Sequence, residues 1–119
     1  MPVKREHERT FPEPAAIADA LLALLHDHGG PKGTMPSDRV YALLGAAMGL
    51  SRAEIDLSRA EYYLGDSSQS PAWNNLVQWA VKALRNDGYL LPASRGRGQW
   101  TLSPEGIRKA STATPAALR

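Results

Sequence analysis

The sequence predicts one small α+β domain that is mostly helical, and three observations support this fold class. The chain has 119 residues, of which 43% are hydrophobic and 22% are charged, and this composition is typical of a single globular domain. Apolar residues recur at helical spacing in three long stretches, each followed by a helix stop signal. Near residue 89 the pattern changes to that of short strands, so we expect a small sheet after the helices.

Apolar stripes and stop signals predict the first two helices. Residues 14–28 carry the first stripe, and a Gly-Gly-Pro run follows it. Residues 38–48 carry the second stripe, with Ser37 as the expected N-cap and Gly49 as the stop. Residues 31–36 contain two prolines and leave room for at most a very short strand between these helices.

A short internal repeat follows, in which residues 50–56 and residues 57–63 both begin Leu-Ser-Arg-Ala-Glu. Each copy contains Ser-x-x-Glu, the capping-box pattern of a helix start. The repeat therefore predicts either one helix or two short ones, followed by a loop over residues 65–71. Tyr62 and Tyr63 fit either a partner surface or packing of that loop.

The third full helix is predicted for residues 73–87, where apolar side chains recur on one side and Gly88 supplies the stop. We expect Trp79 and Trp100 to pack in the core. The place of Trp73 stays open, because this residue begins the helix directly after a polar loop.

The chain after Gly88 predicts a hairpin and a last helix. Residues 89–91 and residues 99–102 have strand character and flank a turn over residues 92–98. Ser103 is then an expected N-cap with a proline at the first helical position, so a short helix follows over residues 104–110.

The predicted domain covers residues 13–111. Residues 1–12 are polar and charged, with Phe11 near their end, and predict a flexible arm, whereas residues 112–119 predict a disordered tail. No stretch has the length of a membrane span, and the first residues lack a secretory apolar segment, so we expect a cytoplasmic protein with no membrane partner. Zero cysteines exclude disulfides and thiolate chemistry.

The element order is that of a winged helix domain: a three-helix core, a two-stranded wing hairpin with an arginine- and glycine-rich tip, and a short C-terminal helix. A family resemblance supports this interpretation, and the residues that carry it are Trp73-Asn74-Asn75-Leu76-Val77-Gln78-Trp79-Ala80, Leu84, Gly88-Tyr89-Leu90, Arg95-Gly96, Trp100-Thr101-Leu102 and Gly106. Together they resemble the N-terminal winged helix domain of Mrr-type restriction proteins. The resemblance covers about residues 14–110 and is strongest over residues 75–106. The chain departs from the family pattern at Leu76, where a basic residue is frequent, and at Ser103, where threonine is usual.

The charges are unevenly distributed along the chain. Net charge is +2, but residues 1–72 carry seven Lys and Arg against ten Asp and Glu, whereas residues 73–119 carry seven against two. This basic C-terminal part indicates an acidic partner.

The resemblance implies that helix 73–87 is a recognition helix in the major groove of double-stranded DNA and that the wing, residues 93–98, contacts the backbone or the minor groove. Amides can pair with adenine, and basic side chains can hold phosphates or reach guanine. The candidate DNA-binding residues are Asn74, Asn75, Gln78, Lys82, Arg85, Arg95 and Arg97. The plain alternative for the helix residues is a solvated polar face.

Nothing in the sequence predicts an enzyme. The nuclease domain that accompanies the Mrr-type module needs an Asp/Glu-x-Lys motif, and this motif is absent from the chain. His26 and His28 stand two apart on a helix and predict no metal site, and we expect no cofactor. A homodimer or a nuclease subunit or domain is a further expected partner. The competing hypothesis is a winged helix that contacts protein only, through helix 14–28 or through a surface around Tyr62 and Tyr63.

Overall fold

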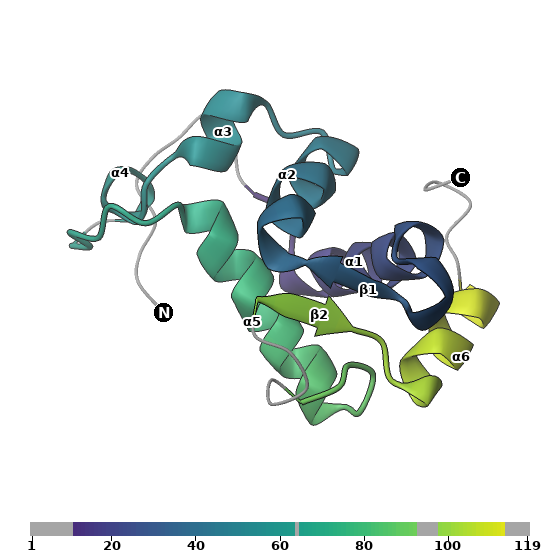
Figure 1. The fold of residues 1–119 in the computed structure, drawn as a ribbon. Coiled ribbons are helices and arrows are strands. Elements are labelled where there is room, and N and C mark those ends of the chain that lie inside the picture. The colour runs from purple at the N-terminus through teal and green to yellow at the C-terminus, as the bar shows by residue number, and fades with distance from the viewer. Residues whose placement is uncertain (1–10, 64, 93–97, 114–119) are drawn as a thin grey trace.

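The computed structural model describes residues 11–63, 65–92 and 98–113, and it confirms a mostly helical α+β chain (Figure 1). Within these residues the chain forms six α-helices, one 3-10 turn and two paired strands. In chain order the elements are α1 (Pro14–His28), η1 (Gly30–Lys32), β1 (Thr34–Pro36), α2 (Ser37–Ala47), α3 (Arg52–Asp56), α4 (Arg59–Tyr62), α5 (Ala72–Asn86), β2 (Gln99–Thr101) and α6 (Pro104–Ala113).

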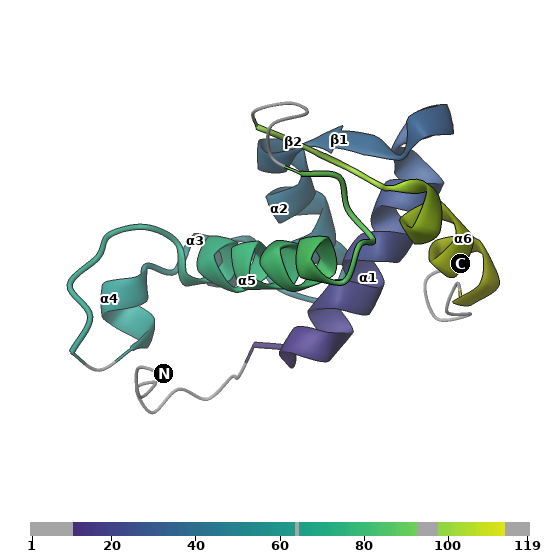
Figure 2. The ribbon, with the colours of Figure 1, turned by 90° about the horizontal axis from the view of Figure 1, so that it is seen from below.

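Helix α1 is the centre of the fold and packs against α2, α5, α6 and β1. Every residue from Ala20 to Leu25 is buried, so this helix is apolar around most of its circumference. Figure 2 shows α1 crossing α5, with α6 beside α1. The bounds of α1 are those that the sequence predicts.

The sheet joins strands from distant parts of the chain, and this differs from the predicted hairpin. Strand β1 pairs antiparallel with β2, and Met35 stands opposite Trp100. The predicted pairing of residues 89–91 with residues 99–102 is confirmed in part: Leu90 forms an antiparallel bridge with Leu102, and the Leu91 N–H donates to the Thr101 carbonyl at 2.9 Å. The Ser103 N–H also donates to the Tyr89 carbonyl at 3.0 Å, on the other side of this bridge.

The tryptophan predictions are partly wrong. Trp73 is fully buried and Trp100 is 7% exposed, whereas Trp79 is 55% exposed and lies outside the core. The buried positions of α5 include Trp73, Val77 and Leu84, which follow one helical stripe. Trp79 lies off that stripe, so the helix turns its indole toward solvent.

An aromatic cluster joins the first described residue to the middle of the chain. The Phe11 ring lies 4.6 Å from the Tyr62 ring and 5.9 Å from the Trp73 ring, measured between centroids. The Tyr62 and Tyr63 rings meet edge to face at 4.8 Å. Both tyrosines are buried by this packing, and Phe11 is also buried, although the sequence placed it in a flexible arm. The rest of that arm, residues 1–10, lies outside the described residues.

The helix starts follow the predicted caps in part. The Ser103 hydroxyl accepts a hydrogen bond from the Gly106 N–H at 3.0 Å and therefore caps α6 as predicted, although α6 continues to Ala113 rather than ending at residue 110. A side chain at Gly106 would collide with the Tyr89 carbonyl, so this contact requires glycine. Ser37 is not an N-cap. It is the first residue of α2, with Pro36 at the N-cap position, and no side chain caps this helix start. The Ser37 N–H donates to the Gly98 carbonyl at 2.8 Å.

The internal repeat forms two short helices, α3 and α4, and each begins with a complete capping box. The Ser51 hydroxyl accepts from the Glu54 N–H at 3.2 Å, and the Glu54 carboxylate accepts from the Ser51 N–H at 2.7 Å. The second box repeats this arrangement with Ser58 and Glu61. Helices this short have little stability of their own. The capping boxes satisfy their first N–H groups and so stabilise each helix at its start.

We expect Ser51→Ala to lower the free energy of unfolding by about 1 kcal/mol, because it removes the acceptor for a helix N-terminal N–H. Urea denaturation followed by circular dichroism measures this loss. Ser67→Ala, in the exposed loop after α4, is the matched control and should leave the unfolding midpoint in place. Equal midpoints for both variants would contradict the role of the box.

Candidate nucleic-acid interface

Helix α5 carries the candidate interface on the face turned away from the core. Its buried side contacts α1, α2 and α3, which leaves Gln78, Lys82 and Asn86 exposed. These residues stand four apart and form one stripe along the helix. The stripe is polar throughout and contains one formal positive charge.

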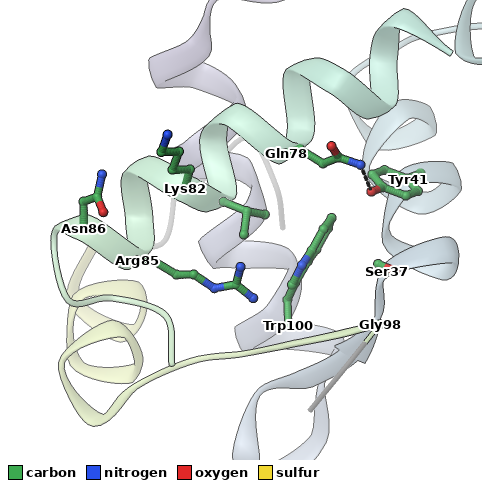
Figure 3. A pocket seen from close by; sticks show the side chains of 9 residues that line it. Ser37, Tyr41, Gln78, Lys82, Arg85, Asn86, Gly98 and Trp100 are labelled. Carbon is green, nitrogen blue, oxygen red and sulfur yellow. Dashed lines mark hydrogen bonds between the residues drawn. The ribbon is translucent and has the colours of Figure 1, made fainter. Parts of the chain in front are cut away.

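A shallow hollow of about 500 Å³ lies between this stripe, the start of α2 and the start of β2 (Figure 3). We call it the polar hollow. Its lining residues are Ser37, Tyr41, Gln78, Val81, Lys82, Arg85, Asn86, Gly98 and Trp100. None of these described residues is an aspartate or a glutamate, so two cationic side chains meet no carboxylate in the lining.

Gln78 is held in place by a residue of α2. Its Nε2 donates a hydrogen bond to the Tyr41 hydroxyl at 2.9 Å, and Figure 3 shows the two side chains pointing toward each other. The Tyr41 ring in turn meets Trp100 edge to face at 5.4 Å between centroids. The amide is therefore oriented before any ligand binds, while its Oε1 remains an available acceptor.

Arg85 is half-buried, and it ties α5 to the chain that follows it. Its Nε donates to the Leu91 carbonyl at 3.1 Å. The guanidinium points into the polar hollow toward Trp100, whereas Lys82 and Asn86 point outward from the helix (Figure 3). Arg85 thus has a structural contact as well as donors that face the hollow.

A second, smaller hollow of about 260 Å³ adjoins the first along α5 and is lined by Asn75, Gln78, Trp79 and Lys82. The Lys82 Nζ lies 5.4 Å from the centroid of the Trp79 ring, within the range of a cation–π contact. Gln78 and Lys82 line both hollows, which makes these two residues the centre of the surface.

The structure brings together four of the seven predicted residues: Asn75, Gln78, Lys82 and Arg85. Asn74 is half-buried and lines neither hollow. Arg95 and Arg97 lie outside the described residues. Gly98, at the base of the predicted wing, lines the polar hollow, so the chain enters β2 beside these side chains.

Sequence reasoning missed Tyr41 and Asn86. Asn86 continues the stripe that begins at Gln78, so helical periodicity alone could have identified it. Tyr41 stands on a different helix, 37 positions before Gln78, and no local pattern indicates that the two residues meet.

The described residues hold no group of three or more histidine, aspartate or glutamate side chains that could bind a metal ion. The His26 ring contacts the next residue in the chain, since its Nδ1 lies 3.0 Å from an Asp27 carboxylate oxygen. In the part of the chain that the structure describes, no helix has the length and apolar character to cross a membrane.

Comparison of the chain with protein-family models, with curated proteins and with solved structures found no match. The function must therefore be argued from the site itself.

Proposed function

We propose that the chain is a winged helix module that binds double-stranded DNA without catalysing a reaction. In this proposal α5 enters the major groove, and residues 93–98 are the wing that contacts the backbone or the minor groove. The order α1, β1, α2, α5, β2 is compatible with a winged helix, in which a short strand between the first two helices pairs with the strand that follows the wing.

The polar hollow is the observation that carries the proposal. Residues of α2, α5 and β2 line one concave surface, and α5 brings two cations to it. No carboxylate among the described lining residues opposes these cations. A phosphate backbone attracts such a surface without regard to base sequence.

The chemistry of the hollow suggests a role for each side chain. Gln78 can accept from the adenine N6 amino group through Oε1 and donate to N7 with the Nε2 hydrogen that Tyr41 leaves unused. Lys82 points outward, as a phosphate contact requires, and Arg85 can hold a phosphate or reach guanine. Arg95 and Arg97 would add cations on the wing.

The resemblance to the Mrr-type module supports a role in targeting a restriction-type nuclease, supplied by a partner subunit or by a further domain. That part of the proposal rests on the sequence residues that carry the resemblance, since the comparisons found no family.

The experiment that tests DNA binding is fluorescence anisotropy of a labelled random-sequence duplex titrated with the protein at several salt concentrations. We expect log K to fall linearly with log salt, by about 0.9 for each phosphate that the protein contacts. If a folded protein, verified by circular dichroism, fails to bind the duplex at low salt, the proposal is wrong.

A further inference from the structure

A third hollow, which we call the apolar groove, lies on the other flank of α5, where this helix crosses α1. It has a volume of about 570 Å³, and its walls come from α1, α5, α6 and Tyr89. Nine of its twelve lining residues are aliphatic or aromatic, in contrast to the polar hollow. Figure 2 shows the crossing of α1 and α5, with α6 beside α1.

The groove contains the most exposed large hydrophobic side chain of the described residues, Trp79 at 55%. Ala83, one turn further along α5, and Ala15 on α1 are also exposed. Trp79, Ala83 and Ala15 thus form an exposed apolar surface that reaches from α5 to α1. A half-exposed indole is moreover a typical anchor of a protein interface.

The shape of the groove fits a helix. Its lining positions on α5 run from Leu76 through Trp79 and Ala83 to Asp87, a single stripe that extends about 16 Å at 1.5 Å per residue. The opposite wall on α1 contains Ala15 and Ala18, whose small side chains allow another backbone to approach closely. About three turns of an amphipathic helix would lie along such a stripe.

The charged residues of the groove indicate which net charge a bound helix should carry. Asp19 and Asp87 line the groove, and neither has an ion-pair partner among the described residues. The Lys109 Nζ lies 5.0 Å from the centroid of the Tyr89 ring and is the one cation in the described lining. The rim is therefore net negative, which disfavours a phosphate backbone.

A second copy of the chain is also a poor fit. In a two-fold symmetric dimer the same surface faces itself, so the excess of carboxylates would be doubled. We propose instead that the apolar groove binds a basic amphipathic helix of a partner protein. Its apolar side chains cover Trp79 and Ala83, and its lysines or arginines face Asp19 and Asp87.

The test uses a fluorescein-labelled synthetic peptide of about 18 residues, with leucines at helical spacing and lysines flanking them. A second peptide carries glutamate in place of every lysine, and a third has the composition of the first with its leucines at alternate positions. We expect the first peptide to bind, and the other two to bind at least about tenfold more weakly.

Variants of the protein test whether the peptide binds in the apolar groove. Ala83→Glu introduces a charge into the apolar wall and should raise the Kd of the lysine peptide by about tenfold or more. The double variant D19K/D87K should weaken the lysine peptide and admit the glutamate peptide. The matched control is D38K/D56K, which changes the net charge equally at exposed residues outside the groove and should leave the Kd unchanged.

Three results would overturn the proposal. The first is equal affinity of the protein for the lysine and glutamate peptides. The second is a Kd of the lysine peptide that does not change in Ala83→Glu. The third is a dimer of the protein in analytical ultracentrifugation that Ala83→Glu dissociates. Trp79 borders both surfaces, whereas Asp19, Ala83 and Asp87 line the groove and neither of the other two hollows. DNA binding is measured separately, so failure of one proposal leaves the other standing.

Discussion

Lys82→Glu should lower the affinity of the protein for a DNA duplex by about tenfold or more at low salt, because it reverses the charge at the centre of the proposed interface. Lys82 lines both hollows on the outer face of α5, and no carboxylate of the described residues shares either lining. The variant removes one phosphate contact and places a negative charge against the backbone. The slope of log K against log salt should therefore also become shallower, by about one unit.

The matched control for this variant is Arg108→Glu. It makes the same change in net charge on α6, at an exposed residue that pairs with Glu105 three positions earlier. An exposed ion pair of this kind adds little stability, so the fold should survive its loss. Equal losses of affinity in the two variants would mean that only net charge matters, whereas full affinity in Lys82→Glu would exclude this face of α5 from DNA contact.

Trp73→Ala should lower the free energy of unfolding by about 3–5 kcal/mol, because it leaves a cavity the size of an indole in the centre of the core. Trp73 is fully buried, and its Nε1 donates to the Tyr41 carbonyl at 2.9 Å, so the variant also removes a partner from that carbonyl. Domains of this size are stable by about 5–15 kcal/mol, so the loss is a large fraction of the total.

Trp79→Ala deletes the same side chain from the same helix and is the matched control for Trp73→Ala. The Trp79 side chain is more than half exposed, so its removal should change the free energy of unfolding by about 0.5 kcal/mol or less. Urea denaturation followed by circular dichroism compares the two variants. Similar unfolding midpoints would contradict the burial difference between these two tryptophans.

Local sequence signals predicted the helices well. The bounds of α1 match its apolar stripe. The two Ser-x-x-Glu patterns predicted either one helix or two short ones, and each pattern does begin a helix, because capping depends on neighbouring residues alone. The sheet was predicted less well. Thr34 and Thr101 are opposite each other although 67 positions separate them, and no nearby residue indicates that pairing. The burial of Phe11 was missed for the same reason, because the rings that cover it, Tyr62 and Trp73, are far from it in the sequence.

The helix stripe also predicted much of the candidate site. Gln78, Lys82 and Arg85 gather at the polar hollow because helical spacing places them on one face. Trp79 was wrongly placed in the core because its residue type was given more weight than its position on the helix. The contact between Gln78 and Tyr41 joins two helices, so only the fold reveals it.

The pairing of β1 with β2 determines when the proposed DNA-binding surface can form during synthesis. Met35 faces Trp100, and the polar hollow is lined by residues from Ser37 to Trp100. The ribosome therefore releases α1, α2 and α5, which ends at Asn86, before the strand that completes the hollow, which begins at Gln99. A nascent chain that ends before Trp100 can pack helix on helix, but it cannot yet form this surface. Contacts of such long range also slow folding, because a long loop must close before they stabilise the chain.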